Sequence, residues 1–125
     1  METYSFMSER KNFIVVKSFD FSVRIVRFCF EMQHQYKEYI ITKQLLKSGT
    51  SVGANIEEVQ GAISKKEFIA KMQISLKEAR ESVYWIRLII KSEVFKSEKL
   101  SQLLVESKEL VYILTKILKT SKLNN

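Results

Sequence analysis

The chain has no proline, three glycines, one cysteine and one histidine among its 125 residues. Proline breaks helix interiors, and loop-rich or β-rich chains of this length contain several, so its absence favours a mostly helical protein. The lone Cys29 excludes an internal disulfide and leaves too few ligands for a metal cluster. No apolar run approaches the ~20 residues of a membrane span. The longest early run, residues 13–16, is too short for a signal-peptide core, so we expect a cytoplasmic protein.

The net charge of +7 is unevenly distributed along the chain. Residues 62–96 contain eight basic and four acidic residues, a net of +4, which is more than half of the excess. Such a segment favours a polyanionic partner, and an oligomer would multiply its charge. Excess lysine that only keeps the protein soluble explains the charge equally well, so charge alone does not decide between them.

Apolar residues recur at helical spacing in four segments, residues 13–36, 38–59, 64–91 and 97–119. Short joins separate them, and no linker divides the chain into domains. We therefore predict a single all-α domain over residues 1–125, an antiparallel up-down-up-down four-helix bundle. Residues 1–11 are predicted to form a loose arm and residues 120–125 a frayed tail.

The first segment carries apolar residues on two opposite faces, about 170° apart at 100° per residue. A helix in a small monomeric bundle needs only one such face, so the second is expected to meet another copy of the chain. One face holds Val16, Phe19, Val23, Val26 and Phe30, and the other holds Phe21, Ile25, Phe28 and Met32. In the third segment, three apolar residues also point away from the core stripe. The predicted oligomer interface is Phe21, Ile25, Phe28, Met32, Ile74, Trp85 and Leu88.

Three local sequence features predict where the helices begin and how closely they pack. Gly49 and Gly53 lie inside the second segment, where each glycine costs about 1 kcal/mol, so we expect a neighbouring helix to approach closely there. Ser64 and Glu67 have capping-box spacing at the start of the third segment. Ser97 is predicted to cap the fourth.

The candidates for catalysis are weak. Glu31 and His34 have the Glu-x-x-His spacing of di-iron bundles, but such a site needs two of these motifs, and the chain has one histidine. Cys29 lies between two phenylalanines, as a buried hydrophobe would. We expect no enzyme activity, no catalytic residue, no metal and no cofactor.

The best functional candidate is a stripe on one face of the third segment that contains no acidic residue. Its cations could follow phosphates, with Tyr84 available to stack on a base. Two structural alternatives stay open. Lys77 could instead pair with Glu81, which follows it at i,i+4 spacing. Arg80 could instead form a salt bridge between subunits. The predicted nucleic-acid site is Lys66, Lys77, Arg80, Tyr84, Arg87 and Lys91, with Gln73 on the same face.

Five stretches of the chain, in order, resemble a bacterial family. The family comprises four-helix-bundle proteins encoded by intervening sequences of large-subunit (23S) ribosomal RNA genes. The stretches are residues 17–19 (KSF), 43–58 (KQLLKSGTSVGANIEE), 64–69 (SKKEFI), 76–81 (LKEARE) and 84–88 (YWIRL).

This resemblance implies a homopentamer with no catalytic residues. The family is similar to the accessory protein of diversity-generating retroelements, a basic pentameric barrel that works with a reverse transcriptase and nucleic acid. Our leading hypothesis is a non-enzymatic homo-oligomer that binds RNA or an RNA-associated protein. The alternative is a structural adaptor that docks a protein partner and uses the basic stripe for intersubunit salt bridges. The sequence names neither the RNA nor the partner.

Overall fold

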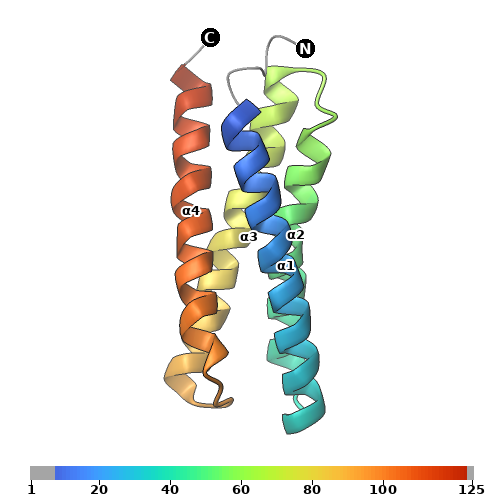
Figure 1. Cartoon of the computed structure of the whole chain (residues 1–125), viewed down its shortest axis with the longest axis vertical. Coiled ribbons are helices and arrows are strands. Elements are labelled where there is room, and N and C mark those ends of the chain that lie inside the picture. The colour runs from blue at the N-terminus through green and yellow to red at the C-terminus, as the bar shows by residue number, and fades with distance from the viewer. Residues whose placement is uncertain (1–7, 124–125) are drawn as a thin grey trace.

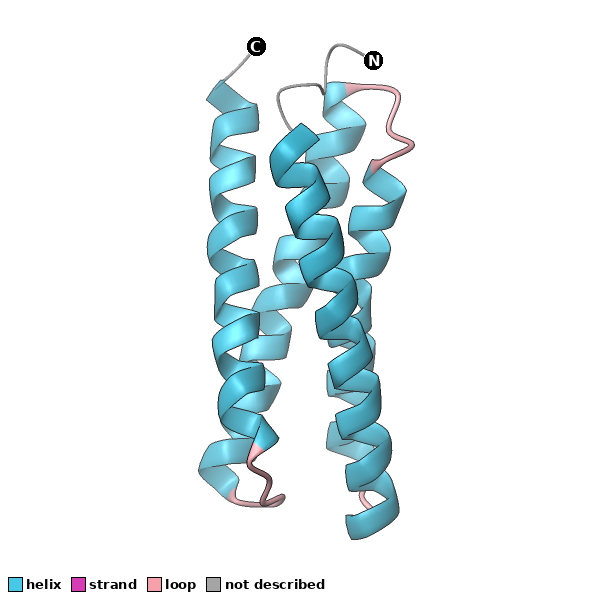
Figure 2. Ribbon diagram, viewed as in Figure 1, coloured by secondary structure: helices cyan, strands magenta, loops and turns pink. Residues whose placement is uncertain are grey.

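Four long helices make up the protein, a computed structural model that describes residues 8–123. α1 (Ser8–Tyr36), α2 (Ile40–Val59), α3 (Lys65–Ser92) and α4 (Lys99–Leu123) run alternately up and down (Figure 1). Short loops join the helices, and no strand occurs in this range (Figure 2). Each helix packs against its neighbours in sequence, and α1 also packs against α4, so α1 lies diagonally opposite α3. The predicted all-α, antiparallel four-helix bundle is confirmed.

The outer helices are longer than predicted. α1 begins at Ser8, inside the segment expected to be a loose arm, and α4 continues to Leu123, inside the expected tail. Residues 1–7 and 124–125 of those segments lie outside the described range. Ser121 explains the difference at α4, because it takes the next inward position after Leu114 and Ile117 and is fully buried. Polar composition therefore did not mark the end of this helix.

Side chains fix where three helices begin. The Glu67 N–H donates to Ser64 Oγ at 3.1 Å, and the Ile63 N–H donates to the Glu67 carboxylate, so Ser64 caps α3 as predicted. Before α4, the Lys99 N–H donates to Ser97 Oγ at 3.2 Å. Glu38 caps the start of α2, because its carboxylate accepts three hydrogen bonds of 2.8–3.1 Å from the backbone N–H groups of the first residues of that helix.

The inward face of α1 is the one that the sequence had assigned to the oligomer interface. Phe21, Ile25, Phe28 and Met32 are at most 2% exposed and belong to the core that all four helices share. Side chains so enclosed within one chain cannot contact another copy, so this part of the predicted interface is wrong.

Close approach of α2 explains why this face turns inward. A Cβ built on Gly49 would lie 2.8 Å from Ile25 Cγ2, and one on Gly53 would lie 3.1 Å from Ser22 Oγ. The predicted approach of a neighbouring helix to these glycines is confirmed, and the neighbour is α1. The lack of side chains on Gly49 and Gly53 thus lets this face of α1 pack closely against α2.

The other apolar face of α1 points to solvent. We call Val16, Phe19, Val23, Val26 and Phe30 the outer α1 stripe. Val16, Phe19 and Phe30 are 60%, 61% and 57% exposed, and the two valines between them are half-buried. Two apolar faces are therefore present as predicted, but the face that the sequence had assigned to the interface is the one that faces the core.

Candidate nucleic-acid interface

The basic stripe lies on the outward face of α3. Its members follow one another at intervals of three, four or seven residues, which keeps them on one side of the helix. Every one of them is exposed: Lys66, Gln73, Lys77, Arg80, Tyr84, Arg87 and Lys91. Within the chain, then, the stripe faces solvent and takes no part in the core.

Among the side chains that the structure describes, those of residues 13–123, ion pairs form through Lys17, Arg24, Lys71 and Lys99, and none forms through a cation of the stripe. The alternative pair between Lys77 and Glu81 is accordingly not formed. Glu81 and the neighbouring Glu78 are half-buried. Burial, followed by repulsion from Glu81, raises the pKa of Glu78. Lys77 attracts the Glu78 carboxylate and opposes this rise, but the described side chains form no direct ion pair with the stripe's cations.

A groove runs between α3 and α4 beside the basic stripe. Lys77 and Arg80 line it from α3, while Lys119 and Lys122 line it from α4. Leu76 and Leu118 supply apolar surface. We call this the α3–α4 groove; its remaining lining residues are Gln73 and Thr115. The antiparallel course of the two helices brings the end of α4 beside the first half of α3 (Figure 1).

Sequence reasoning missed the two α4 lysines. They belong to a different helix from the stripe, and Lys122 falls in the segment predicted to fray. The usable signal was the antiparallel fold itself, which places residues near the end of α4 opposite residues near the start of α3.

A second hollow continues the surface toward the other end of α3. It is lined by Tyr84, Arg87 and Lys91 together with Leu88, Ile90 and Leu104. The Tyr84 ring is 56% exposed, and its centroid lies 5.1 Å from that of Trp85 in an edge-to-face arrangement. Tyr84 is thus held by a neighbour while much of its surface stays open, as stacking on a base requires.

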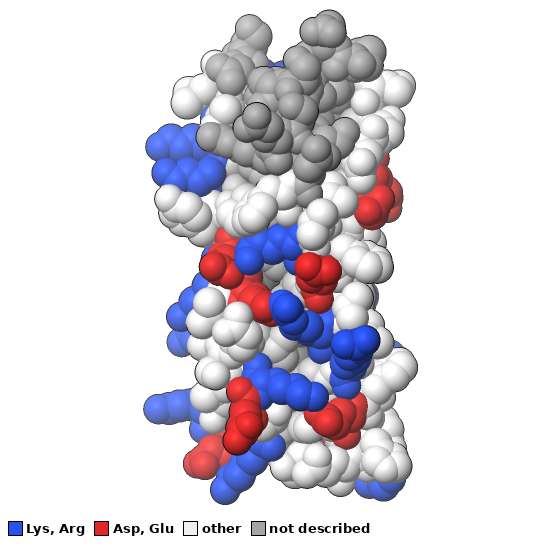
Figure 3. Space-filling model, in the orientation of Figure 1, with Lys and Arg blue, Asp and Glu red and all other residues white. Residues whose placement is uncertain are grey.

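The face formed by α1 and α4 has a different charge pattern. Figure 3 shows Lys and Arg side chains there interspersed with Asp and Glu. Three ion pairs join the two helices: Lys17–Glu109 at 2.9 Å, Lys99–Glu31 at 3.1 Å, and Arg24–Glu106. Three cations on this face are therefore paired with carboxylates, unlike those of the basic stripe.

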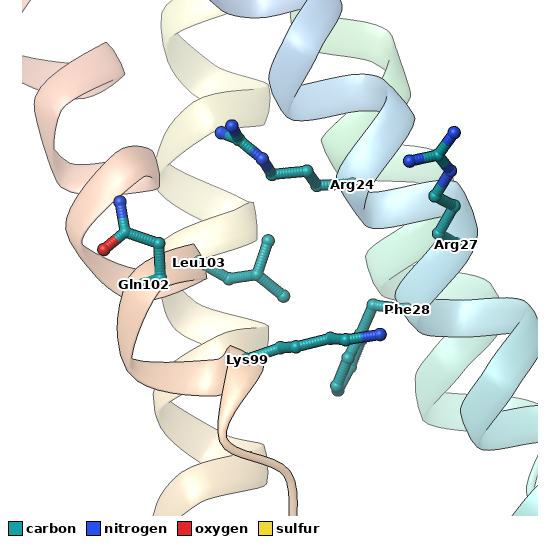
Figure 4. Close-up of a pocket in the computed structure, with 6 residues that line it drawn as sticks. All are labelled: Arg24, Arg27, Phe28, Lys99, Gln102 and Leu103. Atoms are coloured by element: carbon teal, nitrogen blue, oxygen red, sulfur yellow. The ribbon is translucent and has the colours of Figure 1, made fainter.

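A small pocket between α1 and α4 illustrates that difference. Phe28 and Leu103 form its apolar part, with Arg24, Arg27, Lys99 and Gln102 around it (Figure 4). Arg24 extends toward α4, Lys99 reaches across Phe28, and Arg27 points away from them. Arg24 and Lys99 are already paired with glutamates, so Arg27 is the one cation of this pocket without an ion-pair partner among the described side chains.

The remaining predicted interface residues are less enclosed than those of α1. Ile74 is 41% exposed, while Trp85 and Leu88 are half-buried. They lie on α3, so the structure separates them from the inward α1 face with which the sequence had grouped them.

Two observations bear on the residue types that catalysis would use. Within residues 13–123, no three His, Cys, Asp or Glu side chains are placed to hold a metal ion. Cys29 is fully buried, and burial followed by the charge of Glu38 raises its pKa to about 12. The thiol therefore stays protonated at neutral pH. No described helix is long and apolar enough to cross a membrane.

The model of one protein family, described as 23S rRNA-intervening sequence protein, matches residues 10–116. The chain belongs to this family. A crystal structure of a protein with unknown function, from the S23 ribosomal protein family of Bacteroides thetaiotaomicron VPI-5482, is similar with a TM-score of 0.82 and 40% identity. The match covers 87% of this chain and 97% of that one. No curated protein matches the chain.

The extent of the family match bears on the site. In this 23S rRNA-intervening sequence protein the whole basic stripe lies within the matched region, which ends at residue 116. Lys119 and Lys122, by contrast, lie beyond it. On the α4 side of the groove, Thr115 thus lies inside the matched region, whereas the two lysines lie outside it.

Proposed function

We propose that this 23S rRNA-intervening sequence protein is a non-enzymatic, cytoplasmic homo-oligomer that binds RNA, or an RNA-associated protein, through the basic stripe. The observation that carries the proposal is the row of exposed α3 cations without ion-pair partners within residues 13–123. Lysine and arginine side chains in such a row neutralise phosphates and release their counterions. No base-specific contact is needed for this binding.

Self-association is proposed to use the outer α1 stripe. Five apolar residues on one exposed face favour burial against another protein surface, and a second copy is always available. The resemblance to pentameric relatives supports a homopentamer. Because α1 and α3 are diagonal to each other, the outer α1 stripe and the basic stripe lie on separate faces of one chain.

Reversing charge on the basic stripe tests RNA binding. In Lys77→Glu/Arg87→Glu, affinity for a labelled single-stranded RNA, measured by fluorescence anisotropy, should fall at least tenfold. The slope of log K against log salt should shrink by about 1.4, or about 0.7 for each lost phosphate contact. Oligomer size should not change, because neither side chain belongs to the outer α1 stripe through which the chain is proposed to assemble.

The matched control is Lys43→Glu/Lys116→Glu, which makes the same change in net charge at two exposed lysines on α2 and α4. An equal loss of affinity in the control would mean that only total charge matters. Unchanged binding in Lys77→Glu/Arg87→Glu would defeat the proposal.

The lack of an ion-pair partner for Arg80 within residues 13–123 also favours a second candidate, the structural adaptor. There Arg80 would pair with a carboxylate of another subunit. Arg80→Glu would then dissociate the oligomer in sedimentation, whereas under the RNA-binding proposal it weakens RNA binding and leaves the oligomer intact.

A further inference from the structure

We infer that the ligand of this site is single-stranded nucleic acid lying in the α3–α4 groove, held from α4 by Lys119 and Lys122 as well as from α3. The inference rests on the proposed function and adds the path of the strand and two residues outside the family match. On this path, a strand passes between two rows of cations instead of along one helix.

The charges of the groove support this path. Lys77 and Arg80 stand on one side, Lys119 and Lys122 stand on the other, and no acidic residue lines the space between them. All four are exposed and have no ion-pair partner within residues 13–123. A phosphate between the rows is attracted from both sides, which a stripe on one helix cannot provide.

The apolar residues of the groove support a nucleic-acid ligand over a simple anion. The half-buried Leu76 lies among the four cations and offers apolar surface there, while Leu118 is only 5% exposed. Sugars and base faces gain by covering such surface, whereas an inorganic anion does not.

The exposed Tyr84 ring favours one strand over two, because an unpaired strand leaves base faces open for an aromatic side chain to stack on. In a duplex the bases are stacked on one another and are closed to Tyr84.

The second hollow extends the path. From Gln73 to Lys91 is 18 residues, or about 27 Å of helix at 1.5 Å per residue. That length suits a site of four or more nucleotides, within the range of about 4–16 seen for single-strand binding folds. Tyr84 stands part-way along, where it can stack on a base as the backbone passes Arg87.

Anisotropy with a fluorescein-labelled oligouridine 12-mer tests the path, using the full chain. Lys119→Glu/Lys122→Glu should weaken binding at least tenfold, while Lys43→Glu/Lys116→Glu stays within about threefold of wild type. Tyr84→Ala should weaken binding five- to tenfold, with Tyr84→Phe close to wild type, as stacking requires. An RNA hairpin duplex of equal charge should bind at least tenfold more weakly than the single strand.

Each failure has a distinct meaning. If Lys119→Glu/Lys122→Glu behaves like the control while Lys77→Glu/Arg87→Glu loses affinity, the strand follows α3 alone, and the inference falls while the proposed function stands. Equal affinity for the duplex would overturn the single-strand assignment. If the wild-type protein does not bind the 12-mer at low salt, the proposed function and the inference fail together. Matching melting curves would show that the exposed substitutions leave the fold intact.

Discussion

At the scale of single residues, Gly49 sets how closely α1 and α2 approach. Gly49→Ala would place a methyl group 2.8 Å from Ile25 Cγ2, closer than folded proteins allow. We expect it to lower the free energy of unfolding by about 1–3 kcal/mol, the usual cost of overpacking a core. Urea titration would measure this loss.

Gly61 offers a matched control for that substitution. A Cβ there meets only the Glu58 carbonyl oxygen, at 3.7 Å, and the residue is exposed. Gly61→Ala should therefore change stability by less than about 1 kcal/mol. Equal effects at the two glycines would show that loss of chain flexibility, and not contact with Ile25, governs both.

Glu38 makes the stability of the start of α2 depend on pH. Burial raises its pKa, but the N–H groups of Ile41, Thr42 and Ile40 outweigh this, so the net pKa is lowered. A carboxylate with a lowered folded-state pKa stabilises the fold above its unfolded value of about 4.3, and this stabilisation is lost as pH falls. Glu38→Ala should thus cost about 1 kcal/mol at pH 7.

The same substitution should matter much less at pH 3, where wild-type Glu38 is itself becoming protonated. Thermal melts of both proteins at pH 7 and pH 3 would measure the two differences. A deficit of the same size at both pH values would show that the charge of Glu38 contributes nothing to the cap.

At the scale of helices, the sequence predicted the number, order and core pattern of the elements because apolar spacing decides these locally. It could not predict which face of α1 turns inward. Both faces are equally apolar, and the choice depends on Ile25 fitting against Gly49 of another helix. The same limit applied to the site. The basic stripe lies on one helix, so the spacing of its residues predicted it. The groove is formed by two helices, so the sequence alone did not place Lys119 beside the stripe.

The contact between α1 and α4 depends on a buried carboxylate. Glu106 pairs with Arg24 and accepts from Gln102 Nε2 at 3.3 Å, while its Oε1 has no partner within the described residues. Arg24→Met should destabilise the protein by about 1–3 kcal/mol, because the charge of Glu106 loses its main partner.

Arg24→Met/Glu106→Leu should recover most of that loss, since apolar replacements for a buried ion pair are often neutral. Urea titration of both single variants and the double variant gives the coupling energy. If the two losses simply add, the pair contributes no coupling, and another interaction must join the helices.

At the scale of the whole molecule, the apolar and cationic surfaces occupy opposite corners of the bundle. Phe19 and Phe30 stand on α1, and the basic stripe stands on the diagonal helix α3. This separation lets assembly and RNA binding be disturbed independently. Phe19→Ser/Phe30→Ser should shift the sedimenting species toward the 14.7 kDa single chain without unfolding it, because both rings are exposed.

Tyr112→Ser is the control for assembly, because Tyr112 is an exposed aromatic residue on a different helix, α4. It should leave the sedimentation profile unchanged. A wild-type protein that sediments at 14.7 kDa at every concentration would contradict the assembly proposed for the outer α1 stripe.

The enclosure of Cys29 has a practical consequence for labelling. The Cys29 side chain is buried in the core, and its raised pKa keeps the population of the reactive thiolate low. A maleimide dye added to the folded protein would therefore not react with the native thiol, but it would react with a cysteine introduced on the surface. Site-specific probes can thus be attached along either flank of the bundle without first removing Cys29.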